Sequence, residues 1–355
     1  MSVQLTRKTV AAIMEESTVG TPVVPASGSS FVELQDGAFE LTPAFDVLEN
    51  AEIRSSIGEA QPIIGLEAPT GEISHYIRHS GVEGTKPNYS ELLKTAFGSE
   101  VVNSTQYDTI GGSTAGTTSA RATVVVDTGE GVNYQRGQAL LIKDGTNGYN
   151  IRPVYSISSD TLSLGFNLAN APSSGINLGK AIQYKPADSF GALSIWYYRG
   201  NENSVELMSG ARVSEFSLEA NAGEFINGSF SLEGATYYFD PITITSSSKY
   251  LDFLDNATTR VATLTEKTYR DPHDLADAIQ TSMNSLGSAN TFTCTYSNTT
   301  GKFTITSNGS TLTLKWNTGA NTANSIATKI GFTTAADSSA ALTYTSANAQ
   351  SFAAP

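Results

Sequence analysis

An alternating run of residues from Ile73 to His79 constrains the fold of this chain more than any other feature. Isoleucine and histidine occupy one face of this run, and serine, tyrosine and arginine occupy the other. Alternation with a period of two, preceded here by the turn residues 68–71, indicates a β-strand. The residues before it are too charged to fill a core and too regular for a simple linker. We therefore expect a long polar arm at about 41–66 that feeds this strand and orders against a neighbouring subunit.

Short β-strands separated by turn residues are predicted along most of the chain. The Asp36-Gly37 pair lies between two mixed apolar and polar runs and predicts a hairpin within 31–45. Further strands are expected at 9–15, 122–127, 138–144, 149–157, 161–166, 192–200, 204–210, 211–220 and 228–239, and an alternating meander of strands at 291–316. We expect 192–200 to form a hairpin with 204–210, and 211–220 to form another with 228–239.

Three short helices are predicted among these strands. Residues 88–97 have Asn88 or Ser90 as candidate caps and Gly98 as the stop. Residues 271–287 begin with an aspartate that can cap the helix, followed by proline at the first helical position. A third helix is expected at 323–332.

The net charge of −13 is concentrated in the first two thirds of the chain. Residues 1–238 carry 26 acidic and 14 basic side chains, whereas residues 239–355 carry 8 and 7. Surfaces that grip nucleic acid through its phosphates are basic, so such a surface is not expected here. An acidic wall would still allow nucleic acid to pass as cargo, because it repels phosphate. The alternative is an ordinary solvated acidic surface.

The residues that could carry chemistry do not form a recognisable catalytic or metal motif. His75 and His79 on one strand face would lie about 13 Å apart, too far to share one metal ion. The lone Cys294 excludes an intrachain disulfide framework. No apolar stretch approaches the ~20 residues that span a membrane, and the first residues lack the features of a signal peptide. We expect no enzyme activity, no metal and no cofactor.

The aromatic cluster of Trp196, Tyr197, Tyr198, Tyr237 and Tyr238 has two interpretations. Exposed aromatic rings can stack on sugars, but such residues more often fill a barrel core or a subunit interface.

Three short motifs resemble the tail tube (major tail) proteins of long-tailed, non-contractile bacteriophages. They are EIRSSIG at 52–58, the pattern P..G.E.P.G.I at 62–73, and YSELLKTAFG at 89–98. The resemblance extends over roughly residues 5–238. It implies subunits that stack as rings, usually hexameric, around a DNA channel. Residues 240–346 resemble the small α+β module that is attached to various phage tail proteins.

The expected fold class is therefore mainly β, of the α+β kind. Residues 1–238 would form an antiparallel β-barrel or sandwich tail-tube domain with one short packing helix and a strand-rich insertion at about 115–188. Residues 239–350 would form a small α+β decoration domain, and 351–355 a terminal tail.

The resemblance implies a structural virion protein that conducts DNA into the host and has itself, the tape measure protein and the tail terminator or distal tail proteins as partners. Bridging between rings is assigned to the arm residues Glu49, Glu52, Ile53, Arg54, Ile57, Ile63 and Ile64. Candidates for an acidic lumen are Glu33, Asp36, Glu40, Glu59, Glu67, Glu72, Glu219 and Glu233. The alternative is a monomeric β-sandwich that binds a cell surface or a glycan.

Overall fold

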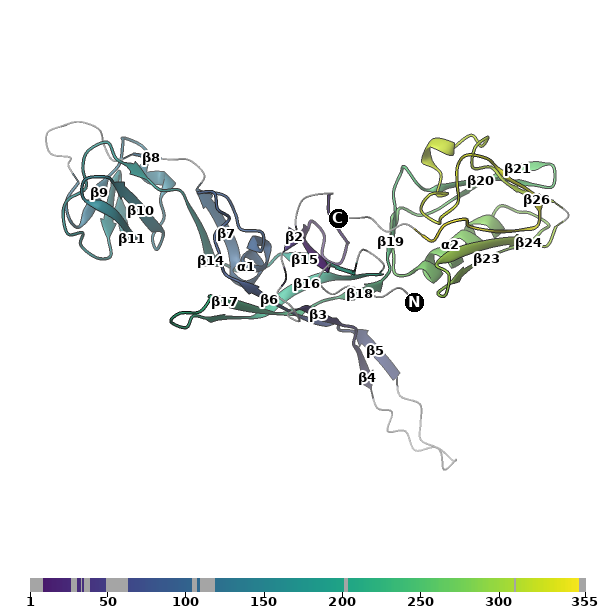
Figure 1. Ribbon diagram of the computed structural model, residues 1–355, viewed down its shortest axis with the longest axis horizontal. Coiled ribbons are helices and arrows are strands. Elements are labelled where there is room, and N and C mark those ends of the chain that lie inside the picture. The colour runs from purple at the N-terminus through teal and green to yellow at the C-terminus, as the bar shows by residue number, and fades with distance from the viewer. Residues whose placement is uncertain are drawn as a thin grey trace, which may run out of the picture. The chain divides into compact units, whose positions relative to one another are not determined.

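The computed structural model describes residues 9–26, 31–32, 34, 39–48, 63–103, 107–108, 119–200, 204–309 and 311–350. The chain forms two compact units. Unit 1 consists of Met1–His75, Ala192–Ser217 and Ser229–Pro355, and unit 2 consists of Tyr76–Gly191 and Leu218–Gly228. The antiparallel arrangement predominates in the sheets, and the described residues contain two α-helices (Figure 1). The predicted mainly β, α+β fold class is confirmed.

An eight-stranded sheet forms the centre of unit 1 in the order β2-β1-β15-β16-β17-β6-β3, with β18 also paired to β16. Its strands are β1 (Val10–Glu16), β2 (Phe31–Val32), β3 (Phe39–Thr42), β6 (Thr70–Tyr76), β15 (Ala192–Arg199), β16 (Ser204–Glu219), β17 (Asn227–Glu233) and β18 (Thr236–Phe239). Strand β15 is buried along most of its length, which explains its run of β-branched and aromatic residues.

The aromatic cluster of β15 and β18 belongs largely to the core of unit 1. Trp196, Tyr198 and Tyr238 are buried and pack with Ala12, Val205 and Leu207. The indole Nε1 of Trp196 donates to the carbonyl of Val23 at 2.8 Å. Of the two interpretations of this cluster, the core interpretation therefore holds for these three rings.

Strand β16 is one continuous strand, although the sequence predicted two separate hairpins there. Its first half pairs with β15 and β18, and its second half pairs with β17. The pairing with β15 shifts register between Met208 and Ala211, around Gly210, whose φ of +64° lies in the left-handed region. The buried carboxylate of Glu16 holds this point, because it accepts from the Gly210 amide at 2.9 Å and from the Ser194 hydroxyl at 2.7 Å. The buried carboxylate thus holds a strand irregularity that alternation alone does not reveal.

The predicted hairpin around Asp36-Gly37 is wrong. Strand β2 pairs with β1 and strand β3 pairs with β6, at opposite ends of the sheet order. The Asp-Gly signal is local, whereas the partners of these strands are set by residues far along the chain.

Unit 2 contains a helix, a two-stranded ribbon and a six-stranded sheet. Helix α1 (Ser90–Phe97) packs on the ribbon of β7 (Gly98–Asn103) and β14 (Ala181–Pro186). Gly98 ends the helix in the left-handed conformation, as predicted, but Tyr89 occupies the N-cap position and neither predicted cap residue does. The sheet order is β8-β13-β10-β11-β12-β9. Its elements are β8 (Tyr107–Asp108), β9 (Thr123–Val125), the 3₁₀ turn η2 (Gly131–Asn133), β10 (Ala139–Asp144), β11 (Gly148–Ser158), β12 (Thr161–Leu164) and β13 (Asn177–Leu178).

The last hundred residues of unit 1 have a hydrophobic cluster of their own, with members from Ile242 to Phe332. Helix α2 (Pro272–Asn284) packs on β23, and the Asp271 side chain caps it by accepting from the Asp274 amide, as predicted (Figure 1). The predicted helix at 323–332 is wrong, because that segment consists of turns around η3 (Thr322–Asn324). The strands are β19 (Ile242–Ile244), β20 (Tyr250–Asp255), β21 (Thr258–Thr263), β22 (Lys267–Tyr269), β23 (Phe292–Ser297), β24 (Lys302–Ser307), β25 (Leu312–Leu314), β26 (Ser338–Ala341) and β27 (Thr343–Thr345).

Candidate assembly surfaces

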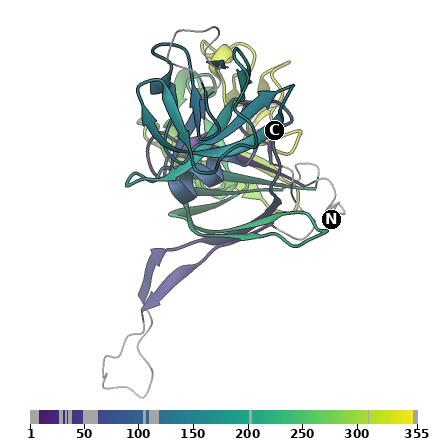
Figure 2. The ribbon, with the colours of Figure 1, turned by 90° about the vertical axis from the view of Figure 1, so that its left-hand side faces the viewer.

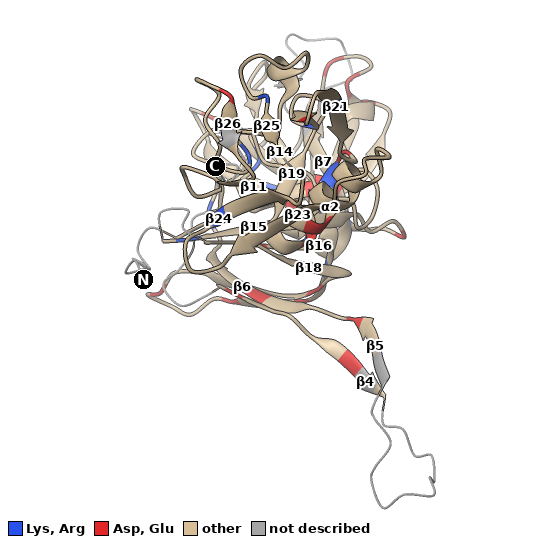
Figure 3. Cartoon of the chain, turned by 90° about the vertical axis from the view of Figure 1, so that its right-hand side faces the viewer, with Lys and Arg blue, Asp and Glu red and all other residues tan. Residues whose placement is uncertain are grey.

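A two-stranded ribbon continues the edge of the unit 1 sheet beyond β3 and β6. It consists of β4 (Phe45–Leu48) and β5 (Ile63–Glu67), paired antiparallel. The amide of Ala68 donates to the carbonyl of Ala44 at 2.9 Å, so backbone pairing bridges the short gap between the two strand pairs. Figures 2 and 3 show the ribbon running away from the sheet.

The ribbon carries large apolar side chains that solvent reaches. Phe45 is 52% exposed, Leu48 57% and Leu66 81%. An isolated two-stranded ribbon is marginally stable in water, and exposed apolar side chains gain stability when a second surface covers them. The ribbon therefore has the properties of a docking element.

The base of the ribbon is fixed by Glu67. Both of its carboxylate oxygens accept from the same guanidinium nitrogen of Arg270 at 2.7 Å, and Oε1 also accepts from the amide of Tyr237 at 2.8 Å. The Glu67 side chain is only 13% exposed. Its negative charge is thus balanced locally by Arg270.

Two other lumen candidates lie directly opposite each other on the outer face of the sheet. Glu40 of β3 pairs with Glu72 of β6 in the strand register, and both are exposed. The Ser229 hydroxyl donates to Glu72 at 2.9 Å, and Thr42 donates to Glu40 at 3.3 Å. Acidic positions in β4, β5 and β6 are visible as red segments in Figure 3. We call Glu40, Thr42, Glu72 and Ser229 the acidic face.

The opposite face of the same strands is apolar. Leu41 and Ile73 are buried, and so are Phe230 and Leu232 of β17. Phe230 stacks on Phe216 of β16 with ring centroids 4.8 Å apart. One packed face and one solvated face are the arrangement that the alternation of these strands predicts.

The remaining predicted assembly residues fall in three groups. Glu219 and Glu233 are exposed near the ends of β16 and β17. Ile63 and Ile64 belong to β5, opposite Leu48 and Val47 in the register. The others lie outside the described residues, namely Glu33, Asp36, Glu49, Glu52, Ile53, Arg54, Ile57 and Glu59.

The two histidines of the alternating run do not share a strand face. Strand β6 ends at Tyr76, so His75 is buried within the strand and His79 is exposed in the loop that follows. Within the described part of the chain, no group of three or more His, Cys, Asp or Glu residues has the arrangement of a metal site. No described helix has the length and apolar character needed to cross a membrane.

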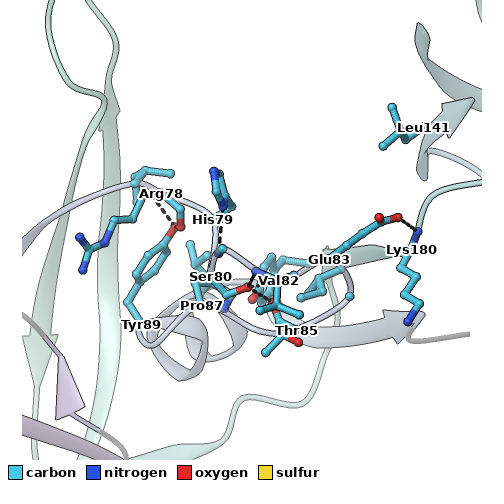
Figure 4. A pocket seen from close by; sticks show the side chains of 16 residues that line it. Arg78, His79, Ser80, Val82, Glu83, Thr85, Pro87, Tyr89, Leu141 and Lys180 are labelled. Atoms are coloured by element: carbon cyan, nitrogen blue, oxygen red, sulfur yellow. Dashed lines mark hydrogen bonds between the residues drawn. The ribbon is translucent and has the colours of Figure 1, made fainter. Parts of the chain in front are cut away.

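A cavity of about 670 Å³ lies in unit 2 between the loop 77–85 and strands β10 and β14 (Figure 4). The phenol of Tyr89 fixes the loop, because it donates to the Arg78 carbonyl at 2.7 Å and accepts from the Arg78 amide at 3.0 Å. Glu83 forms an ion pair with Lys143 of β10 and accepts from the Lys180 amide at 2.6 Å. This cavity was not predictable from the sequence, because its walls come from segments far apart in the chain.

Exposed strand faces, an apolar ribbon and a buried core in each unit characterise a β-rich protein whose surfaces suit association. The family model for phage tail tube proteins matches residues 6–266, and the chain belongs to that family. The predicted tail tube family is thereby confirmed, whereas the resemblance of residues 240–346 to a tail-protein module stays a prediction. A search of curated proteins found no match.

Membership makes the chain a structural component of a bacteriophage virion that self-assembles into a tube. The family role is structural, which suggests a non-enzymatic protein.

Proposed function

We propose that copies of this chain assemble as stacked, hexameric rings into the tail tube of a long-tailed, non-contractile phage, and that DNA passes through the tube into the host cell. The family match carries this proposal. Assembly would take place in the host cytoplasm. The tape measure protein and the tail terminator or distal tail proteins would contact the completed tube.

The arm at 41–66 would bridge successive rings. The exposed Phe45, Leu48 and Leu66 support this role, because their burial against the next ring would stabilise the contact. The residues Ile53, Ile57, Ile63 and Ile64 would add apolar anchors, and Arg54 would pair with a carboxylate across the contact. Sheet edges left open in one copy would be covered by the next, so that the ring closes.

The acidic face would line the lumen together with Glu219 and Glu233. Like charge on the wall keeps DNA phosphates from binding, so DNA slides rather than sticks. Glu67 would contribute little to this field, because Arg270 balances its charge. The small α+β part at 239–350 would lie on the outside of the tube as a separate domain, with 1–238 forming the wall.

Negative-stain electron microscopy of the purified chain tests the proposal most directly. We expect rings or tubes of uniform diameter, with six subunits per ring in class averages. A particle that remains a monomer at every concentration would refute it.

A phage experiment tests the acidic lumen. Phages that carry both Glu40→Lys and Glu72→Lys should assemble tails but eject DNA more slowly than the wild type. Lys329→Glu is the control, and normal ejection kinetics in the double variant would argue against the acidic lumen.

A further inference from the structure

The outer face of strand β11 in unit 2 carries a row of exposed apolar and aromatic side chains. Tyr149 is 71% exposed, Ile151 63% and Tyr155 62%. Pro153, between them, is exposed as well. Tyr149, Ile151 and Pro153 are two positions apart and leave the strand on one side. Tyr155 lies where the register with β12 shifts, between the buried Val154 and Ser156, and is exposed as well, so the row extends over about 20 Å. We call them the Tyr149–Tyr155 stripe.

The stripe is not part of the core of the six-stranded sheet. That core lies on the other face and consists of residues such as Leu140, Val154 and Leu162. Folding therefore does not require aromatic side chains on the outer face of β11. A contiguous exposed apolar patch of this kind usually marks a binding surface.

A cation lies at one end of the stripe. The guanidinium carbon of Arg136 is 5.5 Å from the centroid of the Tyr155 ring. Arg136 is exposed and forms no ion pair with any residue in the described ranges. A guanidinium stacked on a ring keeps its N–H edge available for an anionic group such as a carboxylate or a phosphate.

The cavity of unit 2 adjoins the stripe. Ile151 lies opposite Leu141 of β10 in the strand register, and Leu141 lines the cavity (Figure 4). Its lining also includes Arg78, His79 and Lys180. Glu83 carries the only carboxylate among the described lining residues, and that carboxylate forms an ion pair with Lys143. This region is locally cationic in a chain whose net charge is −13.

The size of the stripe distinguishes between kinds of ligand. Two tyrosines, an isoleucine and a proline expose roughly 400–500 Å² of side chain. A stable protein partner covers about 800 Å² on each side, so the stripe is small for a protein contact. A linear polysaccharide is narrow and long, and its sugar rings have apolar faces that stack on aromatic rings.

We propose that the Tyr149–Tyr155 stripe and the adjoining cavity bind an anionic polysaccharide. Tyr149 and Tyr155 stack on sugar rings about 20 Å apart. Arg136 pairs with an acidic group on the polymer, and the cavity accepts a substituent or a chain end beside Leu141. This binding activity goes beyond formation of a tube and does not depend on the number of subunits in a ring.

Affinity electrophoresis of the full-length protein tests the proposal. Native gels contain either alginate, a polymer of uronic acids, or dextran, a neutral polymer. We expect alginate to slow the protein and dextran to leave its mobility unchanged. Simple ion exchange would not slow a protein that is itself acidic, so retardation reports a specific site.

Substitutions identify the site. Tyr149→Ala and Tyr155→Ala should each weaken the apparent affinity for alginate roughly 3- to 10-fold, whereas Tyr155→Phe keeps the ring and most of the affinity. Arg136→Gln should weaken binding and reduce its salt dependence. Phe225→Ala is the matched control, because that ring is 76% exposed elsewhere in unit 2.

Two outcomes would overturn the proposal. The first is that alginate does not slow the wild-type protein, or that it slows the double variant Tyr149→Ala/Tyr155→Ala as much as it slows the wild type. Circular dichroism must show that both proteins are folded. The other is that the double variant keeps its affinity for alginate but loses self-association in light scattering. The stripe would then be a contact between copies of the chain.

Discussion

At the scale of single residues, the acidic face retains an unfavourable contact. Glu40 and Glu72 are directly opposite each other on neighbouring antiparallel strands. Like charges in this position destabilise a sheet by several tenths of a kcal/mol. The Ser229 and Thr42 hydroxyls donate to the two carboxylates and offset part of this cost. The acidic face therefore carries its charge at a local cost in stability.

Replacing Glu40 with Gln should therefore stabilise the folded protein. The amide oxygen still accepts from Thr42, while the repulsion with Glu72 is removed. We expect the free energy of unfolding to rise by about 0.5 kcal/mol. Urea denaturation measures the change, and the gain should shrink in ~1 M salt, where the screening length is about 3 Å. Glu233→Gln on β17 is the control, and a gain that salt does not alter would contradict the electrostatic explanation.

Asp144 gives a residue-scale prediction that depends on pH. Burial alone would raise its pKa, but hydrogen bonds from Ser173 and Asn147 and from the Thr146 amide outweigh burial and hold the pKa well below its ordinary value. The folded state therefore binds its proton less readily than the unfolded state. The stability that Asp144 contributes is fully present above the unfolded pKa of about 3.9 and is lost as the pH falls below it.

Asp144→Asn should lower stability at pH 7, because the new amide directs hydrogens toward the Ser173 donors. The variant should also lose less stability between pH 5 and pH 3 than the wild type. Urea denaturation at several pH values measures both effects. Asp188→Asn, at an exposed site in the same unit, should follow the wild-type curve. Parallel curves for Asp144→Asn and the wild type would show that this carboxylate does not contribute to the acid sensitivity.

At the scale of elements, strands were predictable where alternation was regular. The strands at 138–144, 149–157 and 161–166 appear as β10, β11 and β12 with boundaries shifted by a few residues. The apolar outer residues of β11 were present in that pattern. Their exposure was not predictable, because the sequence does not show which face of β11 packs on the core.

Pairing between distant strands was less predictable. Residues 31–45 contain a strong local turn signal, yet their strands join β1 and β6. The strand irregularity at Gly210 is held by Glu16, which is 194 residues away in the chain. The acidic candidates show the same limit, since Glu40 and Glu72 meet on one face whereas Glu67 pairs with Arg270.

The ribbon of β4 and β5 gives a prediction at the element scale. Changing Phe45, Leu48 and Leu66 together to Ser should leave the fold intact, because all three side chains are more than half exposed. It should abolish or strongly reduce tube formation, because the apolar contact between rings would be lost. Sedimentation and negative-stain microscopy measure assembly. Val132→Ser is the control, because that side chain is 85% exposed in unit 2. Tubes of normal length from the triple variant would exclude the ribbon from assembly.

At the scale of the whole molecule, charge and core composition both divide the chain near residue 240. The acidic excess lies before this point, and the later part is nearly neutral. The hydrophobic cluster that begins at Ile242 consists entirely of residues after it. Contacts between the two parts include the Arg270–Glu67 ion pair and the bond from the Phe239 amide to the Arg270 carbonyl at 3.1 Å.

A chain that ends at Pro241 should therefore fold and still form tubes. The truncation removes the Arg270–Glu67 ion pair at the base of the ribbon. Glu67 keeps the hydrogen bond from the Tyr237 amide at 2.8 Å, which still holds its carboxylate in place. We expect tubes of the same inner diameter and a smaller outer diameter by electron microscopy. Arg270→Ala in the full chain is the matched control, because it removes the ion pair but keeps the α+β part. If the truncated protein is soluble and folded but does not polymerise while Arg270→Ala does, then the part after residue 241 takes part in the tube wall itself.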